Sequence, residues 1–260
     1  MTSYTEIYER ALGRINSYTL TNAVNKDPIY YYRIMYPFLL NAFGQIISPE
    51  DLLIYLFYRK EPVYEIEDFK GDGIKTSFPF SFDVEVDSPE NIFFRVLLDN
   101  AELINGLDYT YNPLTKSIDF TTVPSDMDAI EIHYYYVGEI VGTNNPNVDV
   151  KLKDWALEIL ASYVITNWKE KDLNRETLVK TNISPKDYNA SSPANLLKEI
   201  KSSFQLAYDN AVSEQGNLDW KIRFLKSKYG NNYNLIASVT NKWYIYILYE
   251  TERRKWIKFI

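Results

Sequence analysis

The chain of 260 residues has no cysteine and one histidine, His133. Without thiols it has neither disulfides nor thiolate metal sites, which fits synthesis in a reducing cytosol. His133 lies in an alternating stretch that places its side chain on the face of Glu131 and Tyr135. Because no second histidine and no cysteine can join it, we interpret His133 as a strand residue and not as a catalyst or a metal ligand.

Long apolar runs and catalytic motifs are also absent. Arg33, Pro37 and Asn41 interrupt the longest apolar candidate, residues 30–43, and the N-terminus has no signal-peptide pattern, so no membrane association is expected. A P-loop, a Gly-x-Ser-x-Gly elbow and a calcium-binding loop are missing. Glycosidase chemistry needs only two carboxylates, but no pair stands out. We predict no enzyme activity, no metal and no cofactor. Five aspartates near turns are interpreted as solvated turn residues: Asp72, Asp83, Asp87, Asp126 and Asp128.

Charge is unevenly distributed along the chain, and aromatic residues are numerous. The net charge is −7, but residues 62–138 hold 15 acids and 4 bases, so this stretch carries −11 and the rest carries +4. Such a balance argues against a general nucleic-acid binder, which needs a basic face, but it is compatible with a conduit to which DNA does not stick. The 23 Tyr and 13 Phe fit interface anchors or an AT-rich genome, and both interpretations stay open.

Three helices are predicted before residue 62. Ser3 and Glu6 form a capping box ahead of an apolar stripe, which predicts a helix over about 4–17. The other two are a helix from Asp27–Pro28 to Gly44, kinked or divided at Pro37, and a short helix over 49–60 that Pro62 stops.

Residues 151–211 predict a hairpin of two amphipathic helices, around which the helical part is organised. Apolar residues from Trp155 to Trp168 recur at three- and four-residue steps. Ser192 is the expected N-cap of the second helix and Pro193 its first residue. One more short helix is expected over 217–229, after Gln215–Gly216.

Between residues 62 and 138 helical spacing gives way to alternation. Turn signals such as Gly71–Asp72–Gly73 separate five predicted strands, at 78–86, 92–98, 108–111, 117–120 and 129–137. This pattern predicts a small antiparallel sandwich or partly closed barrel. A linker follows to residue 150, and helices flank the module on both sides. We therefore expect an insertion that projects from the helical body.

Two segments resemble the helical core of phage head–tail connector (adaptor) proteins. Residues 3–18 look like the first helix of that family. The resembling positions in the hairpin are Leu157–Glu158–Ile159–Leu160–Ala161, Val164, Trp168, Leu178, Ser184, Asp187–Tyr188, Ser192, Ala194–Asn195 and Leu197–Lys198–Glu199. The likeness covers about half of the chain and is a pattern of helix lengths and core positions, without a chemical motif.

The module at 62–138 resembles small β-domains of phage tail and tail-fibre proteins. The resembling motifs are Gly71–Asp72–Gly73, the alternating Phe78, Phe80 and Phe82, Gly106–Leu107–Asp108–Tyr109, and Phe120–Thr121–Thr122–Val123–Pro124. These motifs mainly encode turns, so the likeness indicates a fold and a virion context more than an activity.

The resemblances together imply an α+β protein: a connector-like body (1–61 and 139–240), an inserted β-domain (62–138) and a C-terminal docking segment (241–260). They imply a structural subunit of the virion neck, made in the host cytoplasm, that forms a ring, expected to be a dodecamer, between the portal protein and the next neck or tail protein. DNA would pass through the lumen without specific binding. The alternative is a tail or baseplate component whose β-domain binds a fibre or a host glycan.

The C-terminal segment combines aromatic and basic side chains, the types that dominate interface energetics. Its pattern fits either a strand or a helix, and a final core element is the rival interpretation. In the resembled family the C-terminal extension docks onto the portal. The candidate docking residues are Trp243, Tyr244, Tyr246, Tyr249, Arg253, Arg254, Lys255, Trp256, Lys258 and Phe259.

Overall fold

The computed structural model describes residues 1–15, 18–48, 50–81, 91–142, 150–182, 193–229 and 237–239. They contain both helices and antiparallel sheets, so the protein belongs to the α+β class. The chain divides into two compact units. We call Met1–Asn22, Tyr32–Lys60 and Ile140–Ile260 the helical unit, and Ala23–Tyr31 with Glu61–Glu139 the β unit. In chain order the β unit therefore interrupts the helical unit.

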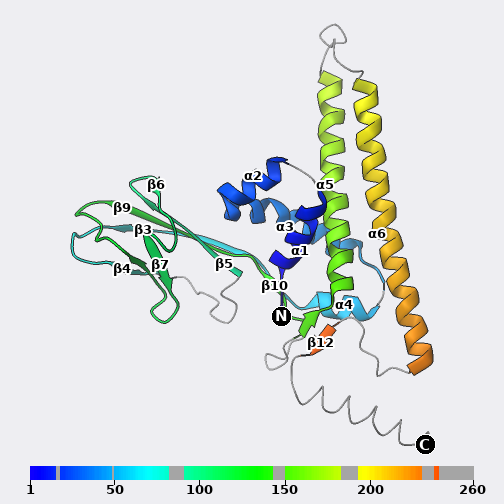
Figure 1. Ribbon diagram of the computed structural model, residues 1–260, viewed down its shortest axis with the longest axis horizontal. Helices are drawn as coiled ribbons and strands as arrows, with labels where there is room; N and C mark the ends of the chain where they lie inside the picture. The colour runs from blue at the N-terminus through cyan, green and yellow to red at the C-terminus, as the bar shows by residue number, and fades with distance from the viewer. Residues whose placement is uncertain are drawn as a thin grey trace, which may run out of the picture. The chain divides into compact units, whose positions relative to one another are not determined.

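Six helices are described: α1 (Tyr4–Ile15), α2 (Tyr18–Lys26), α3 (Pro28–Gln45), α4 (Glu50–Phe57), α5 (Asp154–Asn182) and α6 (Pro193–Tyr229). The long helices α5 and α6 run side by side in opposite directions (Figure 1). Short strands accompany them: β1 (Thr2–Ser3), β10 (Glu139–Ile140) and β2 (Arg59–Lys60) form one sheet in that order, and β11 (Val150–Leu152) pairs with β12 (Ala237–Val239). None of the described helices has the length and apolarity needed to cross a membrane.

The helix α1 follows the predicted pattern. Ser3 Oγ accepts a hydrogen bond from the Thr5 amide at 3.0 Å, and the predicted stripe is buried except for Leu12, which is half-buried. The rings of Tyr4 and Tyr8 lie against rings of α3, among them Tyr36 and Tyr32. The apolar spacing is thus matched by packing, which supplies most of a short helix's stability.

Of the two outcomes predicted at Pro37, a kink or a division of the helix, the division does not occur: α3 continues through Pro37, because a buried apolar face holds the helix on both sides of the proline. Two other predicted boundaries are wrong. The short helix ends at Phe57, and Arg59–Lys60 are strand β2. Instead of ending near residue 211, α6 continues through Gly216 to Tyr229.

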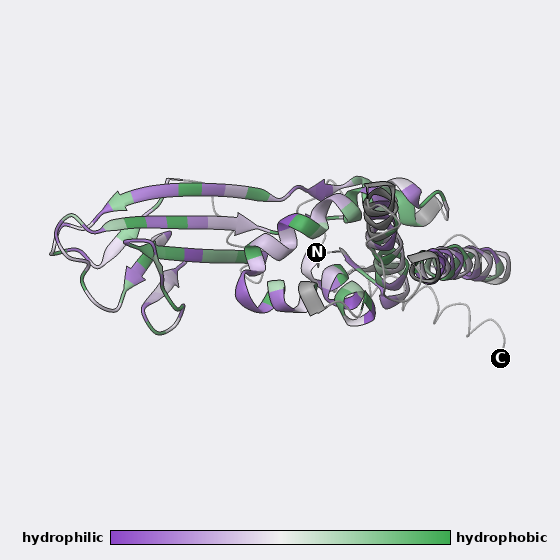
Figure 2. Ribbon diagram, turned by 90° about the horizontal axis from the view of Figure 1, so that it is seen from above, coloured by the Kyte–Doolittle hydropathy of each residue, from purple (hydrophilic) through white to green (hydrophobic). Residues whose placement is uncertain are grey.

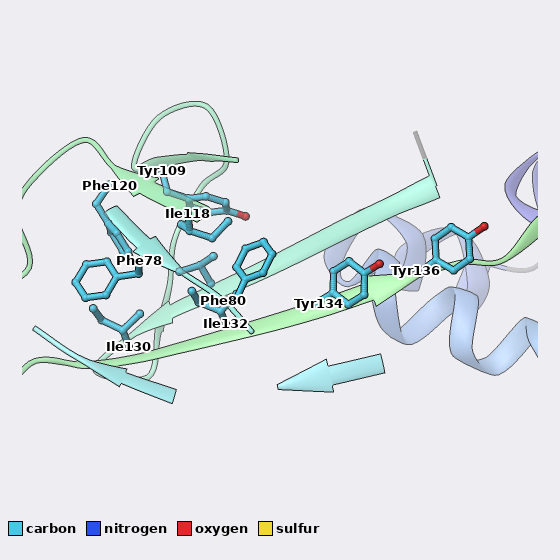
Figure 3. Packing of buried hydrophobic residues seen from close by; sticks show 10 residues of the cluster. Phe78, Phe80, Tyr109, Ile118, Phe120, Ile130, Ile132, Tyr134 and Tyr136 are labelled. Atoms are coloured by element: carbon cyan, nitrogen blue, oxygen red, sulfur yellow. The ribbon is translucent and has the colours of Figure 1, made fainter. Parts of the chain in front are cut away.

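The β unit holds two antiparallel sheets. The first has the order β3-β9-β5-β6, with strands β3 (Val63–Lys70), β9 (Ala129–Tyr136), β5 (Ile92–Leu98) and β6 (Ala101–Glu102). The second has the order β4-β8-β7, with β4 (Ser77–Pro79), β8 (Ser117–Phe120) and β7 (Tyr109–Asn112). Both sheets contribute to one core, in which the rings of Phe78 and Phe120 pack edge to face with their centroids 5.4 Å apart (Figure 3).

Alternation along β9 decides which face is buried in this core. Ile130, Ile132, Tyr134 and Tyr136 point into it, and Figure 2 shows hydrophilic and hydrophobic bands following one another along the long strands. Strands β5, β7, β8 and β9 lie where alternation predicts them. Strand β3 and helix α2 were not predicted, and residues 82–90 of the expected strand 78–86 lie outside the described residues. Residues Ala23–Tyr31, expected in the helical body, belong by their contacts to the β unit.

Candidate interaction surfaces

The outer face of the four-stranded sheet carries a chain of three polar side chains. Tyr64 of β3 is paired across the strands with Tyr135 of β9, and it reaches diagonally to His133, whose Nδ1 lies 2.6 Å from the Tyr64 hydroxyl. The carboxylate of Glu131 meets the other ring nitrogen, Nε2. His133 therefore lies on the face of Glu131, as alternation predicts, and is 9% exposed. A neutral imidazole satisfies both contacts, accepting from Tyr64 and donating to Glu131, so neither ring nitrogen points at open solvent.

An ion-pair triad lies on the same face of the sheet. Arg95 of β5 is the cross-strand neighbour of His133, and its guanidinium reaches Glu102 at 3.1 Å and Asp27 at 3.5 Å. The Asp27 carboxylate also accepts a hydrogen bond from the amide of Tyr30 at 2.9 Å, so Asp27 caps α3 at the point where the sequence predicts the start of the helix. Arg95 thus ties the corner between α2 and α3 to the strands, which explains why Ala23–Tyr31 belong to the β unit.

The carboxylates of the acidic turn residues accept hydrogen bonds from backbone amides. Asp72 accepts from Ile74 at 2.9 Å and from Lys75 at 2.7 Å, and the Lys75 and Ile74 amides lower its pKa. The carboxylates of Asp108 and Asp128 accept hydrogen bonds from the amides of Ile104 and Ser125, at 2.8 Å and 2.7 Å. Within the described part of the chain, no cluster of three or more His, Asp or Glu is arranged to hold a metal ion. These carboxylates therefore serve turn geometry.

Three of these turns expose apolar side chains. We define the loop cluster as residues 71–76, 103–108 and 121–128. Its exposed residues are Ile74 (82%), Ile104 (60%), Leu107 (64%), Val123 (41%) and Met127 (68%). Sequence reasoning missed this surface. The available signal was the presence of large apolar residues inside turn sequences, where polar residues are the rule.

In the helical unit, an ion-pair network joins three helices. Arg10 of α1 bonds Glu158 and Asp154 of α5, both at 2.5 Å. Arg14 of α1 reaches Ser162 of α5 at 2.9 Å and Glu214 of α6 at 3.5 Å. The network lies at the edge of the packed stripes, where such pairs fix orientation more than they stabilise.

Helix α6 also leaves apolar side chains uncovered. Trp220 and Phe224, one turn apart, stack with ring centroids 5.6 Å apart, and both are at least half exposed. Beside them the Lys221 ammonium lies 3.6 Å from the ring centre of Trp155 on α5, a cation–π contact. Trp220 and Phe224 thus form a small exposed aromatic pair on α6. No protein-family model matches the chain. No curated protein matches it either.

The positions that carry the connector resemblance are described in part. In α5, Leu157, Ile159, Leu160, Ala161 and Val164 are buried, which agrees with core positions. Leu197 is half-buried and Lys198 and Glu199 are exposed, whereas the loop residues 183–192 and the side chains of Leu178, Ala194 and Asn195 lie outside the described residues. The same holds for every candidate docking residue from Trp243 to Phe259, so the docking segment stays a prediction.

Proposed function

We propose that the chain is a structural subunit of a phage virion, a head–tail connector (adaptor) that forms a ring between the portal and the tail or neck. The observation that carries the proposal is the packing of the two resembling segments. They are far apart in sequence, yet α1 packs on α5, with Arg10 bound to Glu158, and α5 packs on α6. This packing is compatible with the helical core that the resemblance implies, and in the proposal the β unit is an inserted domain.

In this proposal the protein works by assembly. Side-by-side contacts between unlike faces close a ring, expected to be a dodecamer. The C-terminal segment grips the portal, the opposite face receives the next neck or tail protein, and DNA passes through the lumen. The stacked and exposed rings of Trp220 and Phe224 on α6 support the proposal, because contiguous exposed apolar residues mark contact surfaces.

Electron micrographs of the purified protein test the ring directly, with sedimentation as the solution measurement. Rings with a central opening are expected, and a monomer at all concentrations contradicts the proposal. Truncation after Val239 keeps β12 whole and removes the docking segment. The truncated chain should stay folded and lose binding to purified portal rings. If it unfolds, the segment belongs to the core and the docking role is wrong.

A second candidate is a tail or baseplate component whose β unit holds a fibre or a host glycan. The loop cluster favours this role, because its side chains are presented on turns and are not used in the core. A glycan array probed with the full chain separates the two. Specific glycan binding that the loop cluster mediates, in a protein that forms no rings, would favour the second candidate.

A further inference from the structure

We propose that the loop cluster of the β unit is a preorganised docking surface for a protein partner whose contact face has an apolar centre bordered by lysine or arginine side chains. The inference rests on the proposed role in assembly. Its test does not use ring formation, so the two proposals fail separately.

The three loops form one structure. The Gly71 amide donates to the Asp128 carbonyl at 2.9 Å, and the Met127 amide donates to the Gly71 carbonyl at 3.0 Å, which joins the first loop to the third. Thr121 joins the third loop to the second: its amide donates to the Asp108 carbonyl at 2.8 Å and its hydroxyl to the Leu107 carbonyl at 2.9 Å. The loops that carry the exposed apolar side chains are therefore held to one another by hydrogen bonds.

The backbone beneath these side chains is held in place. The amides of Ile74 and Ile104 are bonded to the carboxylates of Asp72 and Asp108, and the amide of Met127 to Gly71. A surface fixed before binding loses little conformational entropy when a partner arrives. Rigid turns carrying large apolar side chains are thus suited to recognition.

Met127 gives an independent indication. Its φ is 73°, in the left-handed region that glycine and asparagine occupy most readily. A methionine there carries a conformational cost without burying its side chain, which is 68% exposed. The fold alone would be better satisfied by glycine, so the residue is explained by what its flexible thioether contacts outside the chain.

Charge decides the class of partner. The three loops hold four carboxylates, at Asp72, Asp108, Asp126 and Asp128, and one ammonium, Lys75, which pairs with Asp72 at 3.4 Å. A negative border repels phosphates, so nucleic acids and anionic lipid surfaces are disfavoured. It attracts Lys and Arg at the rim of a protein surface and disfavours acidic competitors.

The test is a selection of random peptides on the immobilised full chain. The variant Ile74→Ser/Leu107→Ser/Met127→Ser removes the apolar centre. Leu114→Ser is the matched control, because Leu114 is 94% exposed on the hairpin between β7 and β8, at the other end of the small sheet. Enriched peptides should carry apolar residues flanked by Lys or Arg. They should bind the wild type and the control alike, and the triple variant about ten-fold more weakly or worse.

Several outcomes overturn the proposal. Peptides that bind the triple variant as tightly as the wild type, acidic peptides, or no enrichment at all would each do so. Phosphatidylglycerol vesicles or single-stranded oligonucleotides that bind through the loops would assign the surface to another class of ligand. Should the triple variant lose amide protection in β5 and β9, the single variant Met127→Gly replaces it. Glycine suits the turn, so a folded Met127→Gly protein that binds the selected peptides undiminished also counts against the proposal.

Discussion

Replacing Gly71 by alanine is expected to destabilise the β unit by a steric mechanism that no rotamer change can relieve. A Cβ at this position would lie 2.1 Å from the Ser125 carbonyl oxygen and 3.2 Å from its carbon. The obstacle is backbone, so one loop must shift by about 1 Å to restore van der Waals distance. That shift breaks the two hydrogen bonds of Gly71, to Asp128 and from Met127. Each is worth about 1 kcal/mol; with added strain we expect a loss of about 2–4 kcal/mol.

The matched control is Gly216→Ala, the same chemical change in the other unit. Gly216 lies inside α6, where an added methyl group would meet nothing within 4 Å. Alanine is favoured over glycine in a helix interior by about 0.5–1 kcal/mol, so this variant should be more stable than the wild type. The two substitutions therefore have opposite expected signs.

The distribution of tryptophan lets each unit be measured separately. All five tryptophans lie outside residues 61–139, so their fluorescence during urea unfolding reports on the rest of the chain. Amide hydrogen exchange in β5 and β9 reports on the β unit. In Gly71→Ala, exchange there should accelerate by about thirty-fold to several-hundred-fold, while the tryptophan midpoint stays unchanged. Wild-type protection in Gly71→Ala, or a lower tryptophan midpoint in Gly216→Ala, would refute the reasoning.

Three further predictions concern the units and their charges. Deleting residues 66–137 and joining the ends with a short Gly/Ser linker should leave the helical circular dichroism signal of the remaining chain intact; a loss of helix would show that the helical unit depends on the β unit. Arg14→Ala removes contacts to both α5 and α6 and should lower the free energy of urea unfolding by about 1 kcal/mol. Asp154→Ala alters a side chain that is 79% exposed and should change this free energy by less than about 0.5 kcal/mol. Equal effects would contradict the network's role. Burial, with the charge of Glu102, raises the pKa of Tyr109 to about 12, above its unfolded value of about 10. The stability that the neutral hydroxyl contributes is therefore complete below pH 10 and is lost as the pH rises towards 12. Tyr109→Phe should flatten this alkaline decline in stability, and an unchanged decline would exclude Tyr109 as its source.

Sequence reasoning found the elements whose pattern agrees with their burial. In β9, alternation placed the side chain of His133 on the face of Glu131, and the contact between these two side chains agrees with it. The capping box at Ser3 likewise predicted where α1 begins. Local signal and tertiary packing point the same way in these elements.

The missed elements lack that agreement. Strand β3 is at least partly exposed on both faces, and four of its eight residues are charged. No buried apolar stripe therefore predicts it. Gly216 suggested a helix end, but an isolated glycine costs only about 1 kcal/mol, and packing of α6 on α5 outweighs it. The loop cluster was missed because its apolar residues lie in turns, where periodicity says nothing about their neighbours.

The order of the two units along the chain has a consequence for synthesis on the ribosome. All strands of the two sheets in the β unit have been made once Tyr136 is added, whereas Arg10 of α1 meets Glu158 of α5 across 148 residues. At about 5–20 residues per second this separation lasts about 7–30 s. During that time α1 has α3 as a partner, through Tyr4 and Tyr8, but not α5. On the nascent chain, the side of α1 that receives α5 therefore keeps Arg10 and Arg14 without their α5 partners until Glu158 and Ser162 have been made.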